Sequence, residues 1–226
     1  RQAGCPLLGG DTTRTAKVGD IHAPVTISIT AMGELPQSMG LTRAGARPGD
    51  DIWVSGCVGG AWAALMHRWG KLTLDARVFP SAALAMDRPN PRNALGTALL
   101  SSATACADIS DGLAQDLGHI LERSGVDADV LWDAVPKHPA LAALSQEQQV
   151  EAAMSGGDDY ELVFTAPADK RGLIEQASIS ALTPVTRIGR IIEKKQSGAP
   201  LAIRDASGRP LFLPVQGFDH FAQGAD

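Results

Sequence analysis

The stretch Gly156–Phe164 reads GGDDYELVF and joins an acidic, glycine-rich turn directly to an apolar run. The two glycines favour a tight turn, and Leu162–Phe164 predicts a buried strand immediately after it. Ligand sites of open α/β sheets often form where loops meet strands. This stretch therefore predicts a site-forming loop that leads into a strand.

Two further acidic turns lie upstream of this loop. Residues 9–13 read GGDTT, and residues 108–113 read DISDGL. Aspartates beside glycine supply hard oxygen ligands and leave room for the backbone to approach a ligand closely. Three such turns are typical of a site for a divalent cation and the phosphates that it carries, although they do not name a substrate.

Each turn also has a purely structural interpretation. Asp111 or Ser110 could cap a helix, because apolar residues recur at helical spacing from Leu113 to Leu121. Gly-Asp pairs, such as Gly10 with Asp11, are common in ordinary loops. A helix cap does not account for Asp108, however, and two carboxylates at a helix N-terminus form a good Mg²⁺ seat.

The composition is that of a globular chain with a sizeable core. The 226 residues are 44% hydrophobic, and a net charge of −5 without a run of Lys or Arg argues against nucleic-acid and anionic-membrane partners. No apolar stretch reaches the roughly 18 residues of a membrane span, and no secretory signal is present. Three distant cysteines, Cys5, Cys57 and Cys106, predict reduced thiols in a cytoplasmic protein.

Strand and helix patterns alternate along the chain, which predicts an α/β or α+β fold with helices on the faces of a sheet. The expected strands are residues 25–30, 51–55, 104–107, 127–133, 161–165, 185–192 and 201–204. The expected helices are residues 61–69, 93–102, 113–121, 141–154 and 169–178. Residues 56–60 join a strand to a helix, and they lack the lysine of a P-loop, so we expect a tight turn there.

Four motifs occur in a fixed order: GGDTTR at 9–14, LTRAGARPGD at 41–50, DISDGL at 108–113 and GGDDYELVF at 156–164. Together they closely resemble the thiamine-monophosphate kinases, which belong to the aminoimidazole ribonucleotide (AIR) synthetase-like superfamily. The resemblance covers almost the whole chain. It implies a two-domain fold, with residues 1–40 ending the N-terminal ATP- and metal-binding domain and residues 41–226 forming the C-terminal mixed-sheet α/β domain.

The resemblance also implies an activity. These kinases transfer the γ-phosphoryl group of ATP to thiamine monophosphate, which gives thiamine diphosphate and ADP. Direct in-line transfer assisted by Mg²⁺ needs no protein nucleophile. A cytoplasmic homodimer, formed through the N-terminal domain, is implied as well. The alternatives are a superfamily enzyme that activates an amide, carbamoyl or selenide oxygen with ATP, and a non-catalytic nucleotide- or thiamine-binding module.

Site residues follow from the resemblance by position. The matching metal ligands are Asp11, Asp108 and Asp111; the nucleotide contacts are Gly10, Asp11, Arg43 and Ser110; the substrate contacts are Asp158 and Phe218. Two of them depart from the family pattern. Asp158 stands where a glutamate is usual, and Phe218 stands where the aromatic residue is often tryptophan, which keeps a stacking face but loses the indole N–H.

The chain starts with Arg1, and its first candidate site turn follows already at Gly9. The family has a further N-terminal region of about one small domain, with additional metal-binding aspartates. We therefore expect this chain to be the later part of a longer polypeptide, and we expect it to be weakly active or inactive alone.

Overall fold

The structure is a computed structural model that describes residues 5–13, 17–18, 21–22, 25–35 and 40–211. The chain divides into two compact units, residues 1–40 and residues 41–226. In the first unit, the short strands β1 (Lys17–Val18) and β2 (Ile21–His22) form an antiparallel pair.

The strand predicted over residues 25–30 is not formed. Residues 25–30 have irregular backbone, and Val25, Ile27 and Ile29 are at least 79% exposed. Alternating apolar residues specify a strand only where a neighbouring strand satisfies the backbone and a core covers one face. Neither is present for this segment within the described residues of its unit, so the prediction is wrong.

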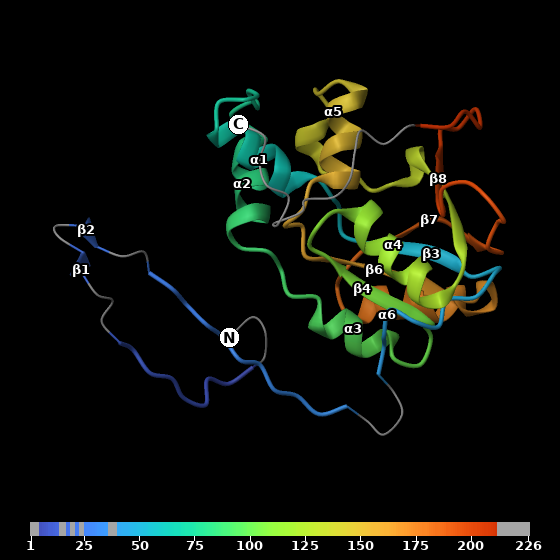
Figure 1. Cartoon of the computed structure of the whole chain (residues 1–226), viewed down its shortest axis with the longest axis horizontal. Helices are drawn as coiled ribbons and strands as arrows, with labels where there is room; N and C mark the ends of the chain where they lie inside the picture. Colours follow the sequence, from blue (N-terminus) through green and yellow to red (C-terminus); the bar gives the residue numbers. More distant parts are fainter. Residues whose placement is uncertain (1–4, 14–16, 19–20, 23–24, 36–39, 212–226) are drawn as a thin grey trace. The chain divides into compact units, whose positions relative to one another are not determined.

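The second unit is built on a six-stranded mixed sheet (Figure 1). Its strands are β3 (Asp51–Ser55), β4 (Ala105–Ile109), β5 (Asp127–Leu131), β6 (Glu161–Ala166), β7 (Val185–Ile192) and β8 (Leu201–Arg204). They lie in the order β4-β6-β3-β7-β5-β8, and only the β5–β8 pair is parallel. The predicted α/β fold with a mixed sheet is confirmed.

Helices cover this sheet on both faces. They are α1 (Gly60–Arg68), α2 (Phe79–Asp87), α3 (Asn93–Leu99), α4 (Leu113–Ser124), α5 (Gln146–Val150) and α6 (Arg171–Ser180). Short 3₁₀ turns span Trp132–Ala134, Pro139–Leu141 and Ala168–Lys170, and a π-helical turn spans Glu151–Ser155. Figure 1 shows α4 on one side of the sheet and α3 with α6 on the other.

The single helix predicted over residues 141–154 is broken into three pieces. Ser145 starts a new helix because its side chain accepts a hydrogen bond from the Gln148 backbone N–H, while the Gln148 side chain accepts one from the Ser145 backbone. After Val150 the helix widens into the π-helical turn, a feature that is frequent at functional sites. This turn runs directly into the Gly156-Gly157 pair.

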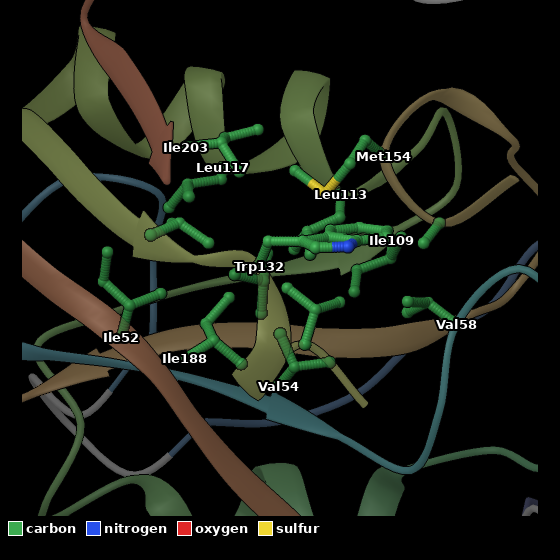
Figure 2. Packing of buried hydrophobic residues seen from close by; sticks show 14 of the residues in the cluster. Ile52, Val54, Val58, Ile109, Leu113, Leu117, Trp132, Met154, Ile188 and Ile203 are labelled. Carbon is green, nitrogen blue, oxygen red and sulfur yellow. The ribbon is translucent and has the colours of Figure 1, made fainter. Parts of the chain in front are cut away.

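Side chains that alternate along β3 pack in two hydrophobic clusters, one on each face of the sheet. Ile52 and Val54 pack in the larger cluster with Leu113 and Leu117 of α4, as Figure 2 shows. Trp53 points to the opposite face and packs with residues of α3 and α6. Because successive side chains of β3 point to opposite faces, this strand packs against helices on both sides of the sheet. Within the described residues, no helix is both long and apolar enough to cross a membrane.

Candidate functional site

The turn between β4 and α4 is held from inside by a buried carboxylate. The helix N-cap is Gly112, at φ 110° and without a side-chain cap. Oδ2 of Asp116, in the first turn of α4, instead accepts hydrogen bonds from the backbone N–H groups of Ser110 (2.9 Å) and Asp111 (3.0 Å). The interpretation of Ser110 or Asp111 as the helix cap is therefore wrong.

The two acidic turns 108–111 and 156–160 lie in direct contact. The Asp158 N–H donates to the Ser110 carbonyl at 2.9 Å, and the Tyr160 N–H donates to the Ile109 carbonyl at 2.8 Å. A Cβ atom on Gly157 would lie 2.2 Å from the Ser110 carbonyl oxygen, so only glycine permits this approach. The structure thus brings together two turns that are about 50 residues apart in sequence.

The carboxylates of Asp108, Asp111 and Asp158 share one surface there with the ring of Tyr160, and we call these four residues the acidic surface. Asp108 and Asp158 are exposed and Asp111 is half-buried. The Tyr160 hydroxyl donates to Oδ1 of Asp158 at 3.1 Å. Partial burial raises the pKa of Tyr160, and the charges of Asp158, Asp108 and Asp111 raise it further, so all three carboxylates act on one phenol.

The backbone of this surface is strained. Asp158 and Tyr160 have φ values of 65° and 50°, in the left-handed region that only a few per cent of non-glycine residues adopt. Such residues cost on the order of 1–3 kcal/mol each and concentrate at ligand sites. The strained pair turns the carboxylate of Asp158 and the ring of Tyr160 outward.

Asp159, the next carboxylate of the motif, points inward and closes the N-terminus of α1. It is 8% exposed, and its Oδ2 accepts a hydrogen bond from the Gly59 N–H at 2.8 Å. Burial raises its pKa to about 7, outweighing the backbone N–H groups of Gly59 and Ala61, which lower it. The start of α1 is thus occupied by a carboxylate of the protein, which agrees with a tight turn at residues 56–60.

Glu161 is also structural. Its carboxylate forms a bidentate ion pair with Arg92, in which both side chains are largely buried, and accepts the hydroxyl of Ser55 at 2.5 Å. Among the three carboxylates of residues 158–161, only Asp158 therefore faces the surface. Exposed and buried residues alternate from Asp158 to Glu161. The period-2 pattern of the following strand, extended backward along the chain, would therefore have predicted that Asp158 faces outward and that Asp159 and Glu161 face inward.

Of the remaining predicted residues, only Arg43 lies in the described part of the second unit, and it lies away from the acidic surface. Arg43 is exposed, and its carbonyl accepts the hydroxyl of Ser124, the last residue of α4. Since α4 has 12 residues and rises about 18 Å, Arg43 lies at the end of this helix opposite Asp111. Gly10 and Asp11 belong to the first unit, where the Thr12 N–H donates to Asp11 Oδ1 at 2.9 Å. Phe218 lies outside the described residues.

The acidic surface suits Mg²⁺ chemically. Within the residues that the structure covers, no group of three or more His, Cys, Asp or Glu side chains could hold a metal by itself. Mg²⁺ is commonly held by only one or two carboxylates together with water and substrate phosphates. Asp108 and Asp111 are such a pair, at the surface and beside a helix N-terminus.

A separate cleft of about 550 Å³ lies over β5 and β7 and contains none of the predicted site residues. Its charged lining is balanced, with Arg187, Arg190 and Arg204 opposed by Asp51, Asp129 and Asp205. Asp51 is already paired with Arg187 at 3.3 Å and with Arg171 at 2.5 Å. This cleft therefore has no excess of charge that would select a ligand.

Comparison with known proteins agrees with the geometry. Residues 47–201 match the family model described as AIR synthase related protein, C-terminal domain. The thiamine-monophosphate kinase of Salmonella typhimurium is 38% identical over 221 residues, which are 96% of this chain and 63% of that relative. The chain thus spans less than two thirds of the length of this curated relative.

Two solved structures are similar as well. The thiamine-monophosphate kinase of Stenotrophomonas maltophilia is 40% identical, with a TM-score of 0.68 over 75% of this chain and 54% of that one. A structure described as "AaThiL complexed with AMPPCP and TMP" is 28% identical, with a TM-score of 0.63 over 80% of this chain and 54% of that one.

Proposed function

The chain belongs to the family of AIR synthase related proteins, and from this premise we propose that it phosphorylates thiamine monophosphate with ATP, giving thiamine diphosphate and ADP. The observation that carries the proposal is the contact between the turns 108–111 and 156–160, which unites a candidate metal-phosphate turn with a candidate substrate turn. The similarity to thiamine-monophosphate kinases, one of them complexed with AMPPCP, an ATP analogue, and with TMP, supports it.

Each turn has its own task in this proposal. Asp108 and Asp111 hold Mg²⁺, and Ser110 contacts the nucleotide. The nucleotide contacts of Gly10, Asp11 and Arg43 stay predictions that follow from the resemblance. Asp158 binds the thiamine substrate, and Phe218 stacks on it. Bound Mg²⁺ would neutralise phosphate charge. The two turns bring the two anionic reactants to one place, and such positioning is the main contribution of a protein to phosphoryl transfer.

Direct in-line transfer agrees with the reactivity of the described cysteines near the sheet. Burial raises the pKa of Cys57 to about 11 and that of Cys106 to about 12. Both thiols stay protonated at neutral pH, and the protonated form is a poor nucleophile. We therefore assign no covalent intermediate to either residue. The homodimer stays a prediction that follows from the resemblance.

The test is thiamine diphosphate formation from thiamine monophosphate, ATP and Mg²⁺, followed by chromatography of the complete gene product. The proposal expects product from the wild type and none from Asp108→Asn, which keeps the side-chain shape but removes a ligand charge. Asp169→Asn, at an exposed aspartate next to α6, is the matched control and is expected to keep full activity.

Two results would contradict the proposal. A folded wild-type protein that forms no thiamine diphosphate would favour an amide- or carbamoyl-activating relative or a binding module. An Asp108→Asn variant with wild-type turnover would remove the 108–111 turn from the active site.

A further inference from the structure

Asp116 is buried beneath the acidic surface and has no access to a ligand. It is 1% exposed, in the first turn of α4. Its Oδ2 accepts both the Ser110 and the Asp111 N–H, while its Oδ1 has no hydrogen-bond partner in the described part of the chain. One oxygen atom thus fixes two consecutive peptide groups of the turn that carries the proposed metal and nucleotide contacts.

The Ser110 residue is held from two sides. Its N–H donates to Asp116 at 2.9 Å, and its carbonyl accepts the N–H of Asp158 at 2.9 Å. Gly157 leaves no side chain to block the second bond. A chain of hydrogen bonds therefore runs from Asp116 through Ser110 to Asp158, across both turns.

We propose that Asp116 is a positioning residue that sets the donor turn 108–111 and the acceptor turn 156–160 relative to each other through Ser110. This inference rests on the proposed function, because it assigns the two turns to the two reactants. Asp116 touches neither reactant and acts only through the backbone that it holds. Residues that hold metal ligands in place without contacting the substrate are commonly needed for activity, and their removal lowers it.

If Asp116 positions both turns, its loss is expected to impair the use of both substrates. If Asp116 held only the metal turn, its loss would alter only the use of ATP and Mg²⁺. Since Ser110 also binds the Asp158 N–H, a displaced Ser110 moves the thiamine-side carboxylate as well. The loss of Asp116 is therefore expected to affect the KM values of both substrates together with kcat.

The experiment compares Asp116→Ala and Asp116→Asn in the complete gene product, with Asp127→Ala as the matched control. Asp127 is 3% exposed, and it too accepts a backbone N–H, from Lys195 at 2.9 Å, but it lies on β5 away from both turns. The readouts are kcat, both KM values and thermal unfolding of each variant.

The alanine variant is expected to lose about 10-fold or more in kcat and to raise both KM values, as outer-shell substitutions commonly do. Asn keeps an oxygen that can accept both N–H groups, so Asp116→Asn is expected to stay within about threefold of the wild type. Asp127→Ala is expected to lose stability but to keep its kinetic constants while folded.

Three results would overturn the inference. These are a folded alanine variant with wild-type constants, a change confined to one substrate, and an equal kinetic loss in Asp127→Ala. If the alanine variant does not fold, the asparagine variant decides: near-wild-type kinetics support the anchor, and a large kinetic loss in a folded protein refutes it. An inactive wild type would instead refute the proposed function, and calorimetric binding of AMPPCP with Mg²⁺ and of thiamine monophosphate would then test whether the loss of Asp116 impairs the binding of both.

Discussion

Replacing Asp159 with asparagine is expected to change how the stability of the protein depends on pH. In the folded protein this carboxyl is buried against the start of α1, and burial raises its pKa from 3.8 to about 7. The unfolded chain releases the proton near the lower value. The folded state therefore binds more protons between these values, and stability falls as the pH rises through this range.

The magnitude follows from the pKa difference. One pKa unit corresponds to about 1.4 kcal/mol, so a shift from 3.8 to about 7 corresponds to about 4 kcal/mol. This contribution is fully present below pH 3.8 and is lost as the pH passes 7. Asparagine carries no ionisable proton and keeps an oxygen that can accept the Gly59 N–H.

Urea unfolding of the wild type and Asp159→Asn at about pH 5 and about pH 8 measures this effect, because the linear extrapolation gives the free energy of unfolding at each pH. Relative to the wild type, the variant should gain stability at the higher pH, by an amount on the order of a few kcal/mol. A difference that stays constant with pH, or that changes in the opposite direction, would show that the carboxyl is already ionised in the folded protein and would refute the reasoning.

Two further predictions concern the contact between the turns. Asp158→Asn is expected to lower the pKa of Tyr160, because it removes a negative charge beside the phenol. Tyr160 is the only tyrosine in the sequence, so the absorbance of tyrosinate reports its titration directly. An unchanged pKa would contradict the geometry. Gly157→Ala is expected to destabilise the protein by about 1–3 kcal/mol and to lower its activity, because the new methyl group meets the Ser110 carbonyl. The control, Gly118→Ala, adds a methyl group in open space within α4 and should stabilise the protein by up to about 1 kcal/mol. Equal midpoints of chemical denaturation for the two variants would contradict the steric argument.

The predictable strands are those whose pattern is enforced by packing in the core. β3, β6, β7 and β8 match the expected strands closely. β3 and β6 contribute buried residues to both hydrophobic clusters, and β7 and β8 contribute buried residues to the larger one. The segment 25–30 alternates equally clearly but forms no strand. Alternation shows which side chains would share a face, and it does not show whether a neighbouring strand is present to pair with. The break in the helix predicted over residues 141–154 depends on the reciprocal cap of Ser145 and Gln148, a local bond that overrides the apolar period.

For the site, the sequence singled out three acidic turns, of which the structure brings two into contact, but it did not predict which carboxylates face the surface and which are buried. Residue type alone cannot separate Asp158 from Asp159, because only the direction of each side chain assigns one to the surface and the other to the start of α1. Asp116 was not singled out, because an aspartate in the first turn of a helix is ordinary. Its significance depends on where Ser110 lies in three dimensions.

The charges of the acidic surface restrict how ligands can be bound there. Partial burial raises the pKa of Tyr160, and the negative potentials of Asp158, Asp108 and Asp111, which overlap at its ring, raise it further. A phosphate that approached such a surface alone would be repelled, whereas a phosphate that carries Mg²⁺ would be attracted to Asp108 and Asp111. In the proposed reaction, the same negative potential would attract the cationic thiazolium ring of thiamine monophosphate to Asp158. The arrangement is thus unfavourable for a free anion and favourable for the metal-bound nucleotide and for the cationic ring of the substrate that the proposed reaction uses.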